Sequence, residues 1–268
     1  MPLYNHSLAE RRWLELRAEK SSTEGNLPTA CTVLVPGKTE AVGLENARLL
    51  VLTDFFASAI WGRDFTHRVI GTTENLSKKV LRLGIEASPA TNATDCQLAV
   101  LPRDFPQVWR GIAFSSAVAC GRLLGGPPLE LILPDFGGDA LRLFFLFQGP
   151  PERDYSFNWH GLSSAYRFVQ RVWRLSQSQE QQPAPSDAAG ALRALTAVVR
   201  ARIDKRKPHT ALAAIMAYLK DKTALSPVEL RAVAELLRPF APVLSAELSG
   251  LVTSVQDDDH RQADEADG

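Results

Sequence analysis

The stretch that decides the fold is GGDALRLFFLFQGPPERDYSFNWHGLSSAYRFVQRVWRL, residues 137–175, because the pattern of the chain changes within it. An apolar helix is expected at 139–147 and a second helix at 162–175, with Gly149, Pro150 and Pro151 between them. Strands are expected only before this break, and helices alone after it. The sequence therefore predicts a first domain over 1–150 and a second domain over 151–255.

Upstream of the break, short apolar runs alternate with helical segments. An S-x-x-E pattern at Ser7 and Glu10 predicts the start of a helix that reaches about Ala18. Strands are expected at 31–35, 65–71, 97–102 and 129–134, and later helices at 44–61, 75–85 and 106–124. This alternation is typical of a parallel sheet with helices on both faces, a Rossmann-like α/β domain.

Downstream of the break, helices are expected at 187–206 and 209–221. Another is expected from Ser226, which precedes a proline and stands three residues before Glu229, and a last one from Pro242. These segments predict an antiparallel bundle of four or five helices. The end of the chain, QDDDHRQADEADG at 256–268, has too little apolar content to pack and is expected to be a disordered acidic tail.

Composition restricts the class of protein. The chain has 268 residues, 45% of them apolar, with 30 basic and 30 acidic side chains. A balanced charge gives no sign of a DNA partner, and no apolar run is long and uncharged enough to enter a membrane. The three cysteines lack metal-ligand spacing and the N-terminus lacks a signal peptide, so we expect reduced thiols, no metal and a cytoplasmic location.

Four segments, spread between residues 4 and 248, resemble class I leucyl-tRNA synthetases. They are YNHSLAERRWLELRAEK at 4–20, the stretch at 137–175 quoted above, PHTALAAIMAYLK at 208–220 and LLRPFAPVLSAEL at 236–248. The resemblance implies a Rossmann-like catalytic domain followed by an anticodon-binding-type helical bundle. It also implies that the editing domain which the family inserts is missing, because 268 residues leave no room for it.

The catalytic signatures of that family are degenerate here. Its HIGH tetrapeptide falls on Ala41, Val42, Gly43 and Leu44, so that only the glycine remains, and its KMSKS loop falls near 118–122, where both lysines are missing. Alanine and leucine cannot donate hydrogen bonds to a phosphate or stabilise charge that develops on phosphorus. The ATP-dependent activation of an amino acid is therefore expected to be largely lost.

Some synthetase-like proteins without these signatures take the amino acid from an already charged tRNA. The ester in leucyl-tRNA is activated, so its transfer to an amine requires positioning and a proton acceptor but no ATP and no cofactor. The resemblance thus implies a leucyl-tRNA-dependent aminoacyltransferase whose acceptor is a small-molecule amine, an intermediate of a nucleoside antibiotic. Two alternatives stay open: residual leucine adenylation with Lys38 or Arg122 as phosphate ligand, and a tRNA-binding paralogue without activity.

Candidate site residues follow the expected strands, since ligands of parallel sheets bind where strands turn into helices. The candidates for acid–base catalysis are Glu45, His67 and Glu74. The candidates for substrate binding are Gly43, Gly71, Thr72, Thr73, Ser115 and Ser116. Each also has a structural interpretation: a packing glycine, a carboxylate that favours a helix start, helix caps at 72–75, and a histidine buried in a strand. Cys120 is expected in the core or at the edge of the site.

A basic segment lies in the expected bundle. Between Tyr166 and Lys207 the sequence has nine basic and three acidic side chains. Arg167, Arg171 and Arg174 recur at the spacing of one helix face, a pattern that suits a phosphate backbone. The predicted tRNA-binding residues are these three together with Arg200, Arg202, Lys205 and Arg206. The alternative is a solvated face with ion pairs.

Overall fold

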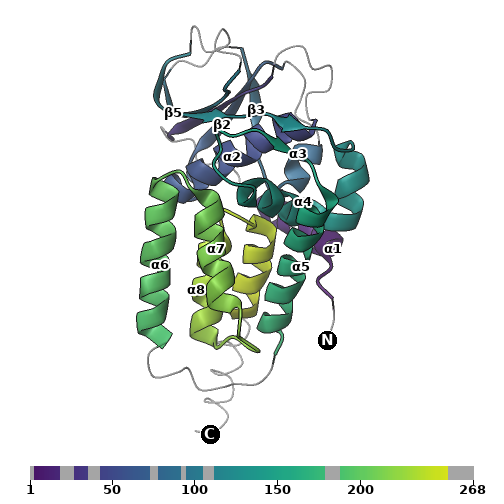
Figure 1. Cartoon of the computed structure of the whole chain (residues 1–268), viewed down its shortest axis with the longest axis vertical. Helices are drawn as coiled ribbons and strands as arrows, with labels where there is room; N and C mark the ends of the chain where they lie inside the picture. The colour runs from purple at the N-terminus through teal and green to yellow at the C-terminus, as the bar shows by residue number, and fades with distance from the viewer. Residues whose placement is uncertain are drawn as a thin grey trace, which may run out of the picture.

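Five parallel strands form a sheet at one end of the molecule, above a bundle of helices (Figure 1). The computed structural model describes residues 3–18, 27–35, 43–72, 78–91, 95–104, 112–178 and 188–252. The strands are β1 (Thr29–Val33), β2 (Thr66–Ile70), β3 (Ser88–Ala90), β4 (Cys96–Pro102) and β5 (Phe114–Cys120). Their order, β3-β2-β1-β4-β5, is that of a Rossmann-like sheet, which confirms the predicted α/β class.

The strand order reverses between β1 and β4. These two strands pair in parallel, with Thr32 opposite Val100, while the other edge of β1 pairs with β2. The carboxyl ends of β1, β4 and β5 therefore lie side by side at one edge of the sheet. In a doubly wound sheet this is where a crevice for a ligand opens.

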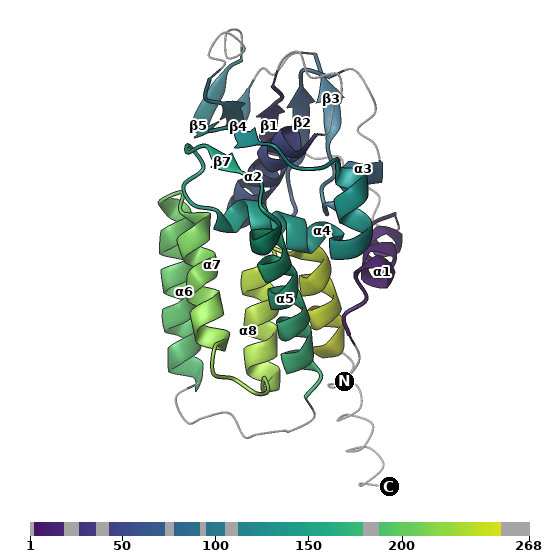
Figure 2. The same cartoon turned by 45° about the vertical axis from the view of Figure 1, so that its right-hand side comes forward.

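Helix α2 (Leu44–Trp61) packs against β1 and β4, and α4 (Leu129–Phe147) packs beneath α2 (Figure 2). Most of α2 is buried, because it is covered by the sheet on one side and by α4 on another. Two further helices, α1 (His6–Ala18) and α3 (Lys78–Arg82), contact α4. None of the helices in the described ranges is long and apolar enough to cross a membrane.

Two expected elements near the middle of the chain are wrong. Residues 129–134 were expected as a strand but form the first turns of α4, where Leu129, Ile132 and Leu133 are buried and Leu131 is 63% exposed. The buried positions are three or four residues apart, as on one face of a helix. This spacing is not visible in the sequence, because residues 131–134 are all apolar. The helix expected at 106–124 is also wrong in its described part, since 114–120 form β5 and Leu123–Leu124 form the short strand β6. Pairing with β4 decides the conformation of β5.

The N-terminal helix begins differently from the expected capping box. Helix α1 starts at His6, and the side chain of Asn5 accepts a hydrogen bond from the backbone N–H of Leu8. Glu10 instead reaches across to α4, where its carboxylate accepts hydrogen bonds from Gly138 N at 2.8 Å and from Arg82 Nε at 3.0 Å. Glu10 therefore ties α1 to α3 and α4 rather than closing its own first turn.

The second half of the chain is helical, as expected. The bundle comprises α5 (Trp159–Ser176), α6 (Ala188–Asp204), α7 (Pro208–Leu219), α8 (Pro227–Leu237) and a helix over 242–252. The capping box at Ser226 and Glu229 is confirmed in both of its hydrogen bonds. A short strand, β7 (Tyr155–Ser156), precedes α5 and pairs with β6. The tail at 256–268 lies outside the described residues.

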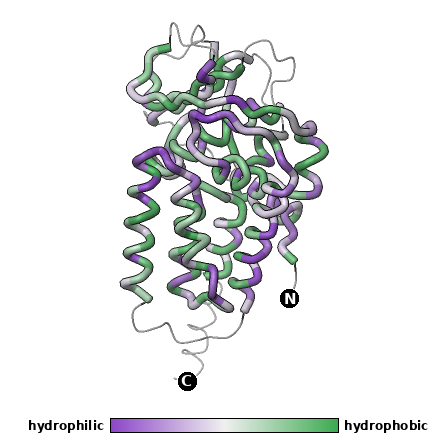
Figure 3. The backbone as a smooth tube through the Cα atoms, viewed as in Figure 1, coloured by the Kyte–Doolittle hydropathy of each residue, from purple (hydrophilic) through white to green (hydrophobic). Residues whose placement is uncertain are grey.

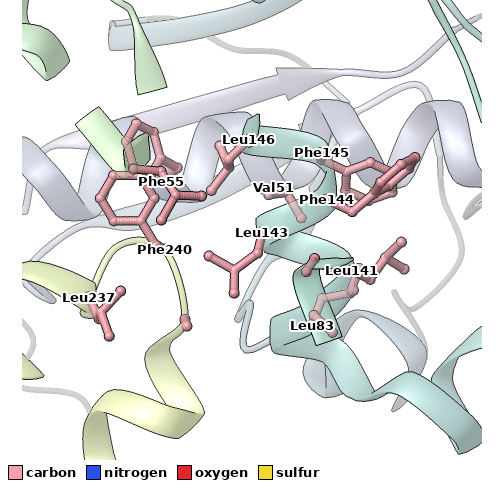
Figure 4. Packing of buried hydrophobic residues seen from close by; sticks show 14 of the residues in the cluster. Val51, Phe55, Leu83, Leu141, Leu143, Phe144, Phe145, Leu146, Leu237 and Phe240 are labelled. Atoms are coloured by element: carbon pink, nitrogen blue, oxygen red, sulfur yellow. The ribbon is translucent and has the colours of Figure 1, made fainter. Parts of the chain in front are cut away.

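One hydrophobic cluster runs from the sheet into the bundle. Phe55 of α2 packs on Phe240, which follows α8, with ring centroids 4.7 Å apart (Figure 4). Helix α4 supplies Leu143 and Phe145 to the same cluster. The division at residue 150 stays a prediction, because the described core passes through both predicted domains.

A buried ion pair lies within this cluster. The guanidinium of Arg142, which is fully buried, contacts the carboxylate of Asp54 at 2.9 Å. The same guanidinium donates to three carbonyl oxygens, those of Leu83 at 3.0 Å, Pro239 at 2.6 Å and Phe240 at 3.2 Å. It thereby joins α4 to α2, to the segment after α3 and to the turn that precedes the last helix.

We predict that Arg142→Met lowers the free energy of unfolding by about 3–5 kcal/mol, because it removes the guanidinium partner of a buried carboxylate and the donor to three carbonyls. Urea denaturation followed by circular dichroism measures this loss. The control is Arg12→Met, whose guanidinium forms an exposed pair with Glu247 at 3.4 Å and for which we expect a loss of at most about 1 kcal/mol. Equal losses in the two variants would contradict a central role for Arg142.

The expectation of reduced cysteines is wrong for two of the three residues. Cys31 of β1 and Cys96 of β4 form a disulfide, and Cys120 is a buried free thiol. The pairing of β1 with β4 brings the two cysteines together although 65 positions separate them. Sequence spacing cannot reveal this contact, because it depends on the order of the strands in the sheet.

A thiol count tests the disulfide. Protein purified without reductant and unfolded in guanidinium should show one thiol that reacts with Ellman's reagent, and full reduction should raise the count to all three cysteines. Cys120→Ser provides the control and should lower the first count to zero. Three reactive thiols before reduction would show that the cysteines are unpaired.

Candidate active site at the switch point of the sheet

A crevice opens where the strand order reverses. Its walls are Val35 after β1, Glu45 and Leu49 of α2, residues 102–104 after β4 and residues 120–122 after β5. The crevice has a volume of about 10 Å³, which is room for about one water molecule. A larger ligand can enter only if side chains at its mouth move.

Glu45 lies at the floor of the crevice, in the first turn of α2. Its side chain is 7% exposed and accepts a hydrogen bond from Arg122 Nε at 3.4 Å. The partial positive charge of the helix start favours a carboxylate at this position. The side chain of Arg122 is 45% exposed, so it can swing outward at little cost and uncover Glu45.

Charged side chains order the mouth of the crevice. Arg103 contacts both carboxylate oxygens of Asp154 at 3.0 Å and also pairs with Asp104. Asp154 accepts a hydrogen bond from the backbone N–H of Arg122 at 2.7 Å. This backbone donor first, and then the Arg103 guanidinium, lower the pKa of Asp154 below its ordinary value. Arg103, Asp104, Asp154 and the backbone N–H of Arg122 are therefore linked in one network beside Glu45, while the Arg122 guanidinium can still move.

A buried arginine binds the chain directly after β5. Arg48 of α2 is fully buried and donates to the carbonyls of Gly121 at 2.7 Å and Pro151 at 3.1 Å, with its guanidinium 5.0 Å from the centre of the Tyr155 ring. Gly121 must be glycine, because a Cβ there would lie 2.4 Å from the carbonyl carbon of Arg153. These contacts fix the chain that carries Arg122.

Cys120 lines the crevice but is not set up as a nucleophile. Burial raises the pKa of its thiol to about 11, so the thiol is protonated at neutral pH. Its position agrees with the expectation of a core or site-lining residue.

The structure brings only part of the expected site together. Gly43 caps α2 next to Glu45, and a Cβ at Gly43 would meet no described atom within 4 Å, so packing does not require glycine there. Gly71 directly follows β2 and has φ +100°, a backbone conformation that favours glycine; Thr72 comes next. Thr73 and Glu74 lie outside the described residues.

Ser115 and Ser116 lie away from the crevice. They belong to β5 rather than to the expected helix, and Ser116 precedes Cys120 by four residues, about 13 Å along a strand. The Oγ of Ser116 accepts a hydrogen bond from Arg206 at 2.6 Å. Neither serine is among the residues that line the described crevice, and this placement favours a structural role.

His67 is enclosed between the sheet and α2. It is 3% exposed, and its Nε2 lies 2.7 Å from Thr32 Oγ1. Thr32 donates its hydroxyl proton to Thr53, and Thr53 donates to the carbonyl of Leu49, so His67 Nε2 must be the donor to Thr32. Burial, with a contribution from Arg142, lowers the pKa of His67 to about 3. This environment favours the structural interpretation of His67 over a catalytic one.

The predicted tRNA-binding residues divide into two groups. Arg171 donates to the carbonyls of Leu219 and Lys220 at the end of α7, and Arg206 donates to Ser116 and to the carbonyl of Ala117 in β5. Arg167 and Arg174 are exposed and make local contacts with Ser164 and Gln170.

The remaining members of the basic set lie near the end of α6. The side chains of Arg200, Arg202 and Lys205 are exposed and form no hydrogen bond or ion pair within the described ranges of the chain. They lie close to the hydrophilic turn between α6 and α7 (Figure 3). Within the predicted tRNA-binding set, the exposed cations without long-range contacts are therefore these three together with Arg167 and Arg174.

Three residues of the mouth are missing from the sequence-based candidates: Arg103, Asp104 and Asp154. Arg103 directly follows a strand that the sequence does predict, so its position at a strand end is a usable signal. Asp154 lies within the 137–175 stretch, but its contact with Arg103 spans 51 positions and depends on the fold.

Within the described residues, no group of three His, Cys, Asp or Glu side chains could hold a metal ion.

Fold and crevice define a Rossmann-like α/β protein with a charged pocket at its switch point. No protein-family model matches the chain. It is 32% identical over 123 residues to the leucine–tRNA ligase of Nitratidesulfovibrio vulgaris (strain Miyazaki F), covering 46% of this chain and 14% of that protein. It is 30% identical over 137 residues to the leucine–tRNA ligase of Chlorobium phaeobacteroides, covering 45% and 17%. The chain thus spans less than a fifth of the length of these curated relatives.

Solved structures with similar parts are also aminoacyl-tRNA synthetases. The LeuRS–tRNA–LeuAMS complex of Agrobacterium radiobacter K84 matches with a TM-score of 0.46 and 19% identity, over 60% of this chain and 29% of that one. Methionyl-tRNA synthetase of Mycobacterium tuberculosis with methionyl-adenylate matches with a TM-score of 0.42 and 18% identity, over 57% and 43%. In sequence, the chain is similar to leucine–tRNA ligases over nearly half of its length.

The buried state of His67 predicts a pH dependence of stability. Between pH 6.5 and about 3 the unfolded chain binds a proton that the folded chain excludes, so the free energy of unfolding decreases as the pH is lowered through this window. His67→Gln removes this titration and retains an N–H donor toward Thr32. Relative to the variant, the wild type should lose about 1.4 kcal/mol per pH unit.

Urea denaturation of both proteins at several pH values measures this difference. Asp139, whose pKa burial raises to about 7, titrates in the same range with the opposite sign, but it is present in both proteins and cancels. A difference that does not change with pH would show that His67 is protonated or exposed in the folded protein.

Proposed function

We propose that this chain transfers leucine from leucyl-tRNA to the amino group of a small molecule, without ATP. The observation that carries the proposal is the position of Glu45, a buried carboxylate at the switch point, directly after the residues on which the HIGH signature falls. Leu44, the last of those residues, is itself buried and packs toward Gly126. A leucine side chain cannot bind a phosphate, whereas a carboxylate can accept a proton from an amine.

The chemistry of the transfer fits one carboxylate and one guanidinium. The acceptor amine attacks the ester carbonyl of leucyl-tRNA, an N–C bond forms, and the bond from the carbonyl carbon to the ribose oxygen breaks. Glu45 takes the proton that the amine loses and returns it to the leaving ribose oxygen. Arg122 pairs with Glu45 in the closed crevice; once it has moved to admit the substrates, its guanidinium would stabilise the negative charge that develops on the carbonyl oxygen.

The leucyl group and the acceptor rest on similarity alone. The leucine–tRNA ligases to which the chain is similar support leucine as the aminoacyl group. We propose a nucleoside antibiotic intermediate as the acceptor, because the size of the chain, its leucyl-type bundle and its missing signatures resemble the tRNA-dependent leucyltransferase of blasticidin S biosynthesis. We propose the exposed cations Arg167, Arg174, Arg200, Arg202 and Lys205 as the surface that binds the tRNA backbone.

A tRNA-binding protein without activity is the second candidate function. The volume of the crevice, about 10 Å³, favours it, because neither the leucyl group nor an amine fits without movement of Arg122. Residual leucine adenylation has less support. Of its two proposed phosphate ligands, Arg122 pairs with Glu45 and Lys38 lies outside the described residues.

We predict that Glu45→Gln lowers the rate of transfer at least about 100-fold and leaves the affinity for leucyl-tRNA unchanged, since the amide cannot accept the proton. The assay incubates the protein with labelled leucyl-tRNA and aminonucleoside acceptors and measures label in the small-molecule fraction, and filter binding measures affinity. The control is Glu15→Gln on the exposed face of α1, which should alter neither quantity.

A parallel assay separates the alternatives. Leucine-dependent exchange between ATP and pyrophosphate would contradict the proposal and support residual adenylation. Binding of leucyl-tRNA without transfer to any acceptor would support the inactive tRNA-binding protein. Equal transfer rates for the wild type and Glu45→Gln would exclude Glu45 as the proton acceptor.

A further inference from the structure

A second hollow lies apart from the switch-point crevice, between the end of α4, the outer side of α5 and the end of α7. Its volume is about 560 Å³, within the range of pockets that hold small molecules. It extends along α5 from His160 to Arg171, about 16 Å at the rise of an α-helix. None of its lining residues belongs to the candidate active site.

The walls of this pocket are apolar. They include Leu143 and Phe144 of α4, Phe168 of α5, and Met216 and Leu219 of α7. Phe147, at the end of α4, lines the pocket with 47% of its surface exposed. A ligand with an apolar body would remove this aromatic surface from water.

The rim is cationic. Arg167, Arg171 and Lys220 line the pocket, and no acidic side chain is among its described lining residues. Arg167 and Arg171 are separated by one turn of α5, so they face the same side of that helix. Their guanidiniums are held in place, the first by Ser164 Oγ at 2.9 Å and the second by the carbonyls that end α7. Of the two, Arg167 has donors that are not used by backbone carbonyls, and an ordered guanidinium of this kind suits a carboxylate or a phosphate.

Two further features lie at the upper end of the pocket. The start of α5, with its Asn158 cap and His160, contributes the positive end of a helix of 18 residues. Gln148 also lines the pocket, and its Oε1 is buried without a hydrogen-bond partner among the described residues. A flip of this amide would turn its N–H donors toward an anionic head group without breaking a bond made by that oxygen.

We propose that this pocket binds a small amphipathic anion, a molecule with an apolar chain or ring and a single carboxylate or phosphate head. The apolar walls contact the chain or ring of the ligand, and Arg167 and Lys220 bind its carboxylate or phosphate group. A nucleotide fits less well, because a base and a ribose need more polar partners than Gln148, Asn158 and Ser164 supply. The inference does not rest on the proposed transfer reaction.

Isothermal titration of the full chain with octanoate and octyl phosphate tests the proposal and distinguishes the two head groups. We expect saturable binding of at least one of them, and binding at least about tenfold weaker for octanol, which lacks the charge, and for acetate, which lacks the chain. Comparable binding of octanol or acetate overturns the proposal. So does tighter binding of adenosine monophosphate, or the absence of binding by both octyl anions.

Variants locate the site. Arg167→Gln with Lys220→Gln should weaken binding of the octyl anion about tenfold, and Ser164→Phe, which places a ring in the pocket, should abolish it. The matched control is Arg174→Gln with Lys205→Gln, which removes two exposed cations that do not line the pocket and should leave the affinity unchanged. Circular dichroism confirms that each variant folds. Equal effects of the two double variants would show that binding reflects net charge rather than this pocket.

Discussion

The buried pair of Arg142 and Asp54 is the interaction on which the arrangement of the two halves depends. A guanidinium without exposure to water is unfavourable unless its donors are used, and here a carboxylate and three carbonyl oxygens use them. Those acceptors come from α2, from the segment after α3 and from the turn before the last helix. The hydrogen bonds therefore fix α4 against the sheet layer and against the bundle at once. The same positive charge contributes to keeping His67 neutral inside the sheet layer.

Local sequence signals were sufficient to predict those elements whose conformation depends on residues close by in the chain. Ser226 and Glu229 complete their capping box within four residues, and β4 and α5 occur where their apolar patterns indicate. Prediction failed where a distant partner decides the outcome. β5 is a strand because β4 pairs with it, and Cys31 meets Cys96 because β1 and β4 are neighbours. The buried residues Leu129, Ile132 and Leu133 have helical spacing. In the sequence this spacing cannot be recognised, because the exposed Leu131 between them is also apolar.

The candidate site shows the same division. Glu45 could be placed from sequence, because a carboxylate at the start of a helix after the first strand of a parallel sheet must lie near the switch point. Arg103 and Asp154 could not be paired, because their contact joins the end of β4 to the segment that follows α4. His67 has the chemistry of a general base, but its placement between β1, β2 and α2 removes it from the crevice. Residue type identifies a chemical capacity, and only the fold decides whether a substrate can reach it.

The arginines of this chain also show that residue type alone does not tell which side chains are available to a ligand. Several of its arginines bind backbone carbonyls where the chain is irregular or where a helix ends: Arg48 at Gly121 and Pro151, Arg142 at three carbonyls, Arg171 at the end of α7 and Arg206 at the edge of β5. A carbonyl without a donor costs free energy when it is buried, and the forked guanidinium can satisfy two or three at once. Arginines used in this way are not available to a phosphate backbone. A count of basic residues therefore overstates the surface that could bind RNA, and the relevant set is the smaller group of exposed cations on α5 and near the end of α6.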